Sequence, residues 1–157
     1  MIKKLAKLLL EKKLVISTAE SCTGGLLSSM LTDVSGSSEY VKLNFVTYAN
    51  EAKHKILNVR LETLEKHGAV SEECAHEMAE GLFNKTGCDI ALCTTGIAGP
   101  TGGTKEKPVG LCYISCRYQG IIHVKKVLLN PDIERTEMKK LFAEHAIEFA
   151  YNILSSN

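Results

Sequence analysis

Two potential nucleophiles, Ser21 and Cys22, are adjacent in the segment 18–25 (TAESCTGG). The segment follows an apolar run and ends in paired glycines, which is typical of a turn that leaves a strand and opens a helix. Free N–H groups at such a turn can hold an oxyanion or a phosphate. Alone, the pattern is equally that of a helix cap formed by Ser21 or Thr23, and the G-x-S-x-G elbow of many hydrolases is absent.

Lys53 and Tyr48 are candidate acid–base groups. Tyr48 ends a second apolar run, and Lys53 follows in the first turn of an expected helix. A lysine can act as a general base when desolvation or nearby positive charge lowers its pKa, and a tyrosine hydroxyl can relay a proton. From the residues alone, a solvated surface lysine is the better interpretation of Lys53. For Tyr48, a half-buried strand aromatic is as good an interpretation as a functional one.

A glycine-rich loop follows a third expected strand, over residues 94–104 (TTGIAGPTGGT). It contains neither the Gly-Lys-Ser/Thr of a Walker loop nor G-x-G-x-x-G. Long loops rich in glycine often bind ligands, because their backbone N–H groups can approach an anion closely. We therefore favour a binding loop over a mobile connector.

Residues that could hold a metal show no ligand spacing. H-E-x-x-H and Cys-x-x-Cys are both absent, and Cys112 and Cys116 share one face of an expected strand, which favours core packing. We expect no metal and no cofactor. With no secretory signal pattern, the six cysteines are expected to be free thiols of a reduced, cytoplasmic protein.

Apolar periodicity predicts strands interleaved with helices, closed by a hairpin at Gln119-Gly120. We expect Asn50 and Ser71 to cap helices and Gly87 to end one. The predicted helices cover 2–13, 26–32, 50–57, 61–67, 71–86 and 132–154, and the predicted strands 14–19, 43–48, 89–95, 109–118 and 121–129. This order predicts an α/β fold, a single three-layer α/β/α sandwich with a mixed, mostly parallel sheet, over residues 1–157.

Composition excludes several partner classes. The chain has 157 residues, 19 basic and 18 acidic side chains and a formal net charge of +1. A near-neutral chain has no broadly basic surface, so we expect no nucleic-acid partner. No apolar run approaches the roughly 20 residues of a membrane span, so we expect no membrane partner.

Taken together, the motifs resemble one family. They are TAESCTGG at 18–25, FVTYANEAK at 45–53, GAVS at 68–71, TGIAGPTGG at 95–103 and KPVG at 107–110. Their order over one domain is similar to that of the CinA C-terminal domain family, whose stand-alone members are nicotinamide-nucleotide amidases. The resemblance implies hydrolysis of nicotinamide mononucleotide to nicotinate mononucleotide and ammonia, in the recycling of pyridine nucleotides. It also implies a metal-independent cytoplasmic homodimer, and we expect the chain to consist of the amidase domain alone.

The resemblance also implies roles for individual residues. Ser21 and Lys53 match a Ser/Lys catalytic pair, with Tyr48 close by. Arg135 matches a phosphate-binding position, although the local sequence PDIER departs from the Gly-Asp-Arg of many members, and Lys139 replaces a second arginine of the family. The implied substrate-binding residues are Glu20, Cys22, Thr23, Gly24, Ser38, Thr95, Gly96, Gly99 and Arg135.

Amide hydrolysis needs an activated nucleophile and a stabilised oxyanion. Our hypothesis is that Lys53 deprotonates Ser21, which attacks the carboxamide carbon, while helix-start N–H groups near Cys22 and Thr23 hold the oxyanion. Cys22 stays an alternative nucleophile, and Ser21 could orient water instead of forming an acyl-enzyme. A hypothesis of another class is a non-catalytic nucleotide-binding or regulatory module linked to competence or DNA damage.

Overall fold

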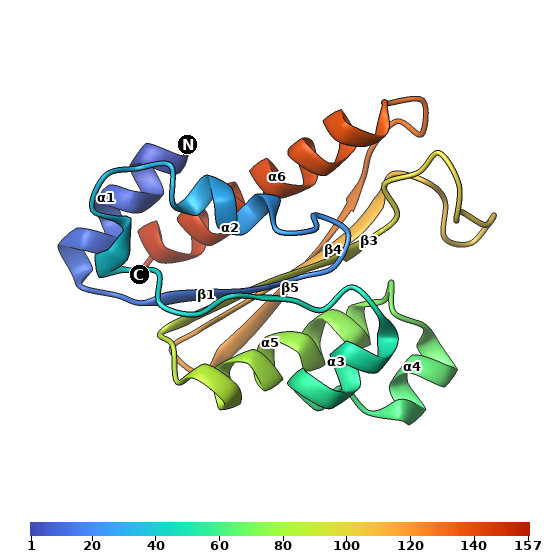
Figure 1. Cartoon of the computed structure of the whole chain (residues 1–157), viewed down its shortest axis with the longest axis horizontal. Coiled ribbons are helices and arrows are strands. Elements are labelled where there is room, and N and C mark those ends of the chain that lie inside the picture. Colours follow the sequence, from blue (N-terminus) through green and yellow to red (C-terminus); the bar gives the residue numbers. More distant parts are fainter.

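A computed structural model describes all residues 1–157 and shows one sheet between two layers of helices (Figure 1). One layer consists of α1 (Ile2–Lys12), α2 (Leu26–Leu31) and α6 (Arg135–Ser155). The other consists of α3 (Asn50–Leu57), α4 (Leu61–His67) and α5 (Glu72–Thr86). The predicted three-layer α/β architecture is therefore confirmed.

The sheet has five strands in the order β2-β1-β3-β4-β5. Their bounds are β1 Ile16–Glu20, β2 Phe45–Val46, β3 Ile90–Gly96, β4 Leu111–Tyr118 and β5 Ile121–Leu128. Strand β1 pairs in parallel with β2 and β3, whereas β4 pairs antiparallel with β3 and β5. Only β4 runs against the other strands, so the sheet is mixed and mostly parallel in direction, as predicted. All of β1 is buried, because helices cover both faces of a parallel sheet.

Each helical layer closes its own apolar core. The larger core joins α1, α2 and α6 to the sheet, and Met138, Phe142 and Ala146 recur along α6 at the spacing of one helical face. The smaller core lies under α5 and includes Met78 and Leu82. The sheet is thus fixed from both sides, which holds the ends of its strands in place.

Several predicted boundaries are confirmed by their contacts. The Ser71 hydroxyl accepts a hydrogen bond from the Cys74 N–H at 3.1 Å and caps α5. Gly87 ends the same helix in the left-handed conformation, with φ 67°. The β4–β5 hairpin turns through Gln119 and Gly120, both with positive φ, which suits a tight two-residue turn.

Other boundaries were predicted wrongly. Ala49 is the residue before α3, so Asn50 is its first helical residue and not its cap. Helix α6 begins after Glu134, whose carboxylate accepts a hydrogen bond from the Thr136 N–H at 2.9 Å, and not at Asp132. These errors arose because several polar residues near each helix start can act as a cap.

Strand β2 has two residues where a run of six was predicted. The Asn44 side chain accepts a hydrogen bond from the Thr18 N–H at 2.9 Å, in the place where a longer β2 would have offered a backbone carbonyl. A side chain has thus replaced the backbone ladder just before Phe45.

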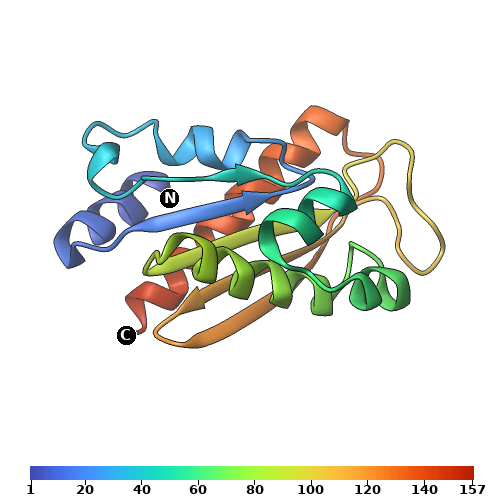
Figure 2. The same cartoon turned by 60° about the horizontal axis from the view of Figure 1, so that its bottom comes forward.

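The parallel strands direct the polar loops to one edge of the sheet. Figure 2 shows the arrowheads of β1 and β2 pointing toward α3 and the yellow loop that follows β3. The segments 21–25, 47–50 and 97–110 therefore meet at the carboxyl edge, where open α/β sheets usually bind ligands. None of the six α-helices combines the length and the apolar character that spanning a membrane would need.

Candidate active site

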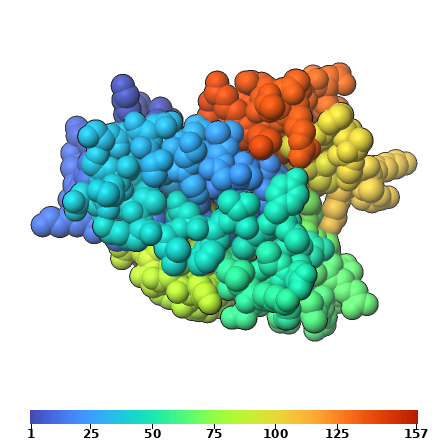
Figure 3. Space-filling view, in the orientation of Figure 1, coloured from blue at the N-terminus to red at the C-terminus, as the bar shows by residue number.

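A cavity of about 380 Å³ lies at this carboxyl edge. Figure 3 shows the segments around it meeting on one face, with the start of α6 in orange, the segment after β2 in cyan-green and residues 97–110 in yellow. Its lining residues are Ser21, Cys22, Tyr48, Asn50, Lys53, Ala69, Val70, Thr95, Gly96, Ile97, Ala98, Gly99, Thr101, Gly102 and Arg135. The structure thus brings together most of the residues that the sequence suggested.

Lys53 is buried beside Ser21. Its side chain is 1% exposed, and Nζ lies 3.0 Å from Ser21 Oγ, 2.8 Å from the Thr47 carbonyl oxygen and 3.1 Å from the Tyr48 carbonyl oxygen. Burial lowers the pKa of the Lys53 amine below its ordinary value. The interpretation of Lys53 as a solvated surface residue is therefore wrong, since helix α3 turns this side chain inward.

The three contacts of Nζ suit a general base. In a neutral amine, the carbonyls of Thr47 and Tyr48 accept both N–H bonds, and the lone pair is left facing the Ser21 hydroxyl. No Asp or Glu forms an ion pair with Lys53, so no carboxylate opposes loss of the proton. The arrangement can take a proton from Ser21.

Two N–H groups beside Ser21 donate no hydrogen bond within the protein, those of Cys22 and Thr23. They lie in the turn before α2, whereas the first amides of α2 itself are already occupied. We expected the free amides at the start of the helix, but the structure places them in the turn before it. Of the two residues only Cys22 lines the cavity, so its unpaired amide next to Ser21 is the suitable donor to an oxyanion.

Glu20 occupies the start of α2. Its buried carboxylate accepts hydrogen bonds from the N–H groups of Leu27 and Ser28 at 2.8 and 2.9 Å, and from the hydroxyls of Thr23 and Ser28 at 2.6 Å each. A further bond comes from the Gly25 N–H at 3.1 Å. A buried carboxylate needs such partners, and Glu20 therefore shapes the Ser21 turn from outside the cavity.

The structure does not bring Thr23, Gly24 and Ser38 into the cavity either. Thr23 is buried behind the turn, where its hydroxyl also contacts that of Thr94 at 2.9 Å. Gly24 faces Lys139, whose Nζ lies 3.5 Å from the position a Cβ would take. Ser38 is exposed in a short 3₁₀ turn, Ser37–Glu39, away from the lining residues.

Arg135 lines the cavity despite its altered local sequence. Its guanidinium donates hydrogen bonds to the Gly99 carbonyl at 2.6 Å and to the Tyr48 hydroxyl at 3.2 Å. Tyr48 is 58% exposed, so it is a mouth residue and not a half-buried strand aromatic. The lining contains two basic side chains, those of Lys53 and Arg135, and no acidic one. Such a cavity favours an anionic ligand.

The sequence interpretation missed Asn50, Ala69 and Val70 as lining residues. Asn50 lies three residues before Lys53 and so shares its helix face. Ala69 and Val70 belong to the GAVS motif, which was noted only as a family marker. The buried Thr95 hydroxyl donates to the Ala69 carbonyl at 2.8 Å and holds this segment at the cavity wall.

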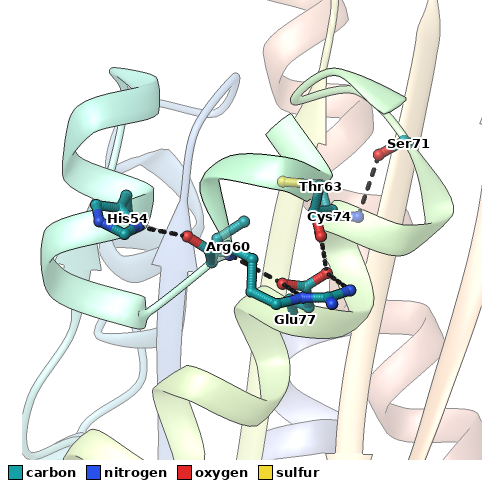
Figure 4. A network of polar contacts seen from close by, with 7 residues as sticks. His54, Arg60, Thr63, Ser71, Cys74 and Glu77 are labelled. Carbon is teal, nitrogen blue, oxygen red and sulfur yellow. Dashed lines mark hydrogen bonds and ion pairs between the residues drawn. The ribbon is translucent and has the colours of Figure 1, made fainter. Parts of the chain in front are cut away.

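The helices behind this wall are joined by a polar network (Figure 4). The Glu77 carboxylate on α5 accepts hydrogen bonds from the Arg60 N–H at 2.9 Å and from the Thr63 hydroxyl. His54 on α3 contacts the Val59 carbonyl at 2.8 Å. The network links α3, α4 and α5. Lys53 lies on α3, and the segment 68–71 connects α4 to α5. No group of three or more His, Cys, Asp or Glu side chains is placed to hold a metal ion.

The family model of the CinA C-terminal domain matches residues 1–154. The chain belongs to the CinA C-terminal domain family. A CinA-like protein of Chlorobium chlorochromatii is 50% identical over 137 residues, which are 86% of this chain and 32% of that protein. A CinA-like protein of Syntrophomonas wolfei is 58% identical over 112 residues, 71% of this chain and 27% of that protein. This CinA domain thus spans about a third of the length of the curated relatives it matches.

Solved structures share the fold of this CinA domain. A CinA superfamily protein from Klebsiella pneumoniae superposes with a TM-score of 0.94 at 31% identity, covering 99% of this chain and 96% of that one. The competence/damage inducible protein CihA from Agrobacterium tumefaciens superposes with a TM-score of 0.89 at 41% identity, covering 96% and 95%. The three-layer arrangement is therefore that of the family.

Proposed function

We propose that this CinA domain is a nicotinamide-nucleotide amidase, which hydrolyses nicotinamide mononucleotide to nicotinate mononucleotide and ammonia. The observation that carries the proposal is the 3.0 Å contact between Lys53 Nζ and Ser21 Oγ, which is buried and free of any carboxylate partner. A buried lysine next to a serine is an established means of activating a hydroxyl. The family resemblance supplies the substrate.

The reaction begins when Lys53 takes the Ser21 proton and Oγ attacks the carboxamide carbon. The N–H of Cys22, a residue that lines the cavity, stabilises the oxyanion, at about 3 kcal/mol for a well-placed donor. The C–N bond then breaks, and the Lys53 ammonium returns its proton to the departing ammonia. Water, deprotonated by Lys53, attacks the resulting ester and releases the carboxylic acid.

The rest of the cavity suits a nucleotide monophosphate. A volume of about 380 Å³ is in the range of small-molecule sites. Arg135 lies at the rim and still has N–H bonds beyond those to Gly99 and Tyr48, which can bind a phosphate. A Cβ at Gly96 or Gly99 would meet Cys112 or Val109 of the protein itself, whereas Gly102 has room around it and can let the backbone approach the ribose closely.

Ser21 is a better nucleophile here than Cys22. The Cys22 thiol belongs to the buried core and contacts Cys112 at 3.8 Å between the sulfurs. It makes no hydrogen bond with a histidine or lysine that could activate it. The Ser21 hydroxyl, in contrast, makes the contact with Lys53.

The test is ammonia release from nicotinamide mononucleotide by the purified protein, with and without a chelator. We expect release that survives the chelator and is lost in Ser21→Ala, with binding of the nucleotide retained in calorimetry. Ser21 and Lys53 act as one catalytic unit, so Lys53→Ala should lose about as much activity as Ser21→Ala. Binding without ammonia release by the wild type would instead support the non-catalytic nucleotide-binding module.

A further inference from the structure

Two thiols meet behind the proposed nucleophile. The sulfurs of Cys22 and Cys112 are 3.8 Å apart, although the residues are 90 positions apart in the chain. Cys22 lies in the turn that carries Ser21, and Cys112 lies on β4 opposite Gly96, itself a cavity residue. All six cysteines are free, so this pair is in the dithiol form.

The two thiols differ in access. Cys22 lines the cavity and is 6% exposed, whereas Cys112 is fully buried. No other cysteine lines the cavity. A small oxidant that enters the site therefore meets Cys22 first. Burial and the neighbouring Cys22 raise the pKa of the Cys112 thiol.

We propose that Cys22 is an oxidative modification site for peroxides and that Cys112 captures the oxidised sulfur as a disulfide. The Cys22 thiolate attacks one oxygen of hydrogen peroxide, breaks the O–O bond and becomes a sulfenic acid, and the other oxygen leaves as water after protonation. The Cys112 sulfur then attacks the Cys22 sulfur, loses its proton, and expels a second water. The thiol pair loses two electrons, and the peroxide accepts both.

The bond requires a movement that disturbs the catalytic pair. An S–S bond is about 2.0 Å long, so the sulfurs must approach by about 1.8 Å from their contact of 3.8 Å. Cys112 is held by strand pairing with Gly96 and Val127 on either side, so we infer that the approach falls on Cys22 and on the irregular turn that carries it. Its movement displaces the Cys22 N–H and the adjacent Ser21, whose hydroxyl lies 3.0 Å from Lys53 Nζ.

The oxidised form is therefore inactive, a consequence that rests on the amidase proposal. Misplacement of a reacting group by about 1 Å can cost about 100-fold in rate. Reduction by a dithiol restores the pair through thiol–disulfide exchange and should restore activity. The site would thus be switched off reversibly by peroxide.

The experiment treats the purified protein with hydrogen peroxide, then alkylates remaining thiols and maps the peptides by mass spectrometry. We expect a Cys22–Cys112 linked peptide and the loss of two hydrogen atoms from the intact mass, before any other cysteine changes. Cys112→Ala is the informative variant, because its Cys22 should gain oxygen atoms instead of a cross-link. Cys116→Ala is the matched control, since Cys116 shares the strand and core of Cys112 and should still allow the cross-link.

Activity gives a second readout, with each protein compared to its own untreated sample. Wild type and Cys116→Ala should lose amidase activity about tenfold or more and regain it with dithiothreitol. In Cys112→Ala no disulfide protects Cys22 from irreversible oxidation, so dithiothreitol should not restore the activity that this variant loses. Absence of the cross-link, or a cross-link between other cysteines, would overturn the proposal. If untreated protein releases no ammonia while the cross-link forms, the amidase assignment fails and the modification site stands.

Discussion

Lys53 is the residue whose surroundings change its chemistry most. An isolated lysine is charged at neutral pH and is a poor base, whereas burial between Ser21 and two carbonyl groups lowers the pKa of its amine. The carbonyls of Thr47 and Tyr48 accept the N–H groups of this amine. Activity should therefore depend on pH through this group.

We expect kcat/KM for ammonia release to rise with pH and to level off at a pKa below the ordinary lysine value of 10.5. The sign follows from the mechanism, since only the neutral amine accepts the Ser21 proton. The measurement is a pH–rate profile with nicotinamide mononucleotide. Lys53→Arg is the matched variant, because it keeps the positive charge but cannot lose its proton, and it should be inactive at every pH. A flat profile would contradict this role of Lys53.

The loop of residues 97–110 is the element that completes the cavity, and it is held at two points. Arg135 binds its Gly99 carbonyl from the α6 side. On the other side, the Lys107 ammonium donates to the His67 carbonyl at the end of α4, where a positive charge also complements the helix dipole. Lys107 itself does not line the cavity, so it acts by positioning the loop.

Lys107→Met should raise KM about fivefold with little change in kcat, because the loss of about 1 kcal/mol falls on loop closure and not on the chemical step. Steady-state kinetics give both constants. Lys105→Met is the control on the same loop, since Lys105 is exposed and makes no hydrogen bond, and its constants should equal those of the wild type. An equal effect of both substitutions would show that the loss of loop charge, and not the contact with His67, is responsible.

At the same scale, most elements were predictable from local signals, including the short helices α3 and α4, whereas strand β2 was not. Helix α5, with Ser71 before it and Gly87 after it, has both local signals and a strong apolar periodicity. Strand β2 begins later than predicted because the side chain of Asn44, inside the predicted strand 43–48, binds the Thr18 N–H. A contact between residues that are distant in sequence has no local signature, so pattern analysis could not find it.

The buried free thiols make the stability of the whole molecule depend on pH, because their pKa values differ between the folded and unfolded states. Burial raises the pKa of Cys74 to about 11 and that of Cys116 to about 12. The pKa values of Cys93 and Cys112 also lie above the ordinary value, again because of burial. In the unfolded chain these thiols ionise at about 9. Above that pH the unfolded state has lost protons that the folded state keeps, so stability falls as pH rises.

We expect the free energy of unfolding in reducing buffer to decline above about pH 9, by up to about 1.4 kcal/mol per pH unit for each such thiol. Urea unfolding at several pH values measures this decline. The double variant Cys93→Ala/Cys116→Ala removes two of the titrating groups, so its curve should fall less steeply and approach that of the wild type as pH rises. Parallel curves would contradict the prediction.

The homodimer implied by the resemblance stays a prediction.

The order of elements, the fold class and the identity of the polar loops followed from the sequence alone, because periodicity and turn residues act over a few neighbouring positions. The motifs TAESCTGG and TYANEAK also placed Ser21 and Lys53 as candidates. Only the tertiary structure decided that Lys53 is buried against Ser21, that Glu20 serves α2 and not the cavity, and that Cys22 meets Cys112. These outcomes depend on burial and on contacts across the sheet, which arise only when the parallel strands bring distant segments to one edge.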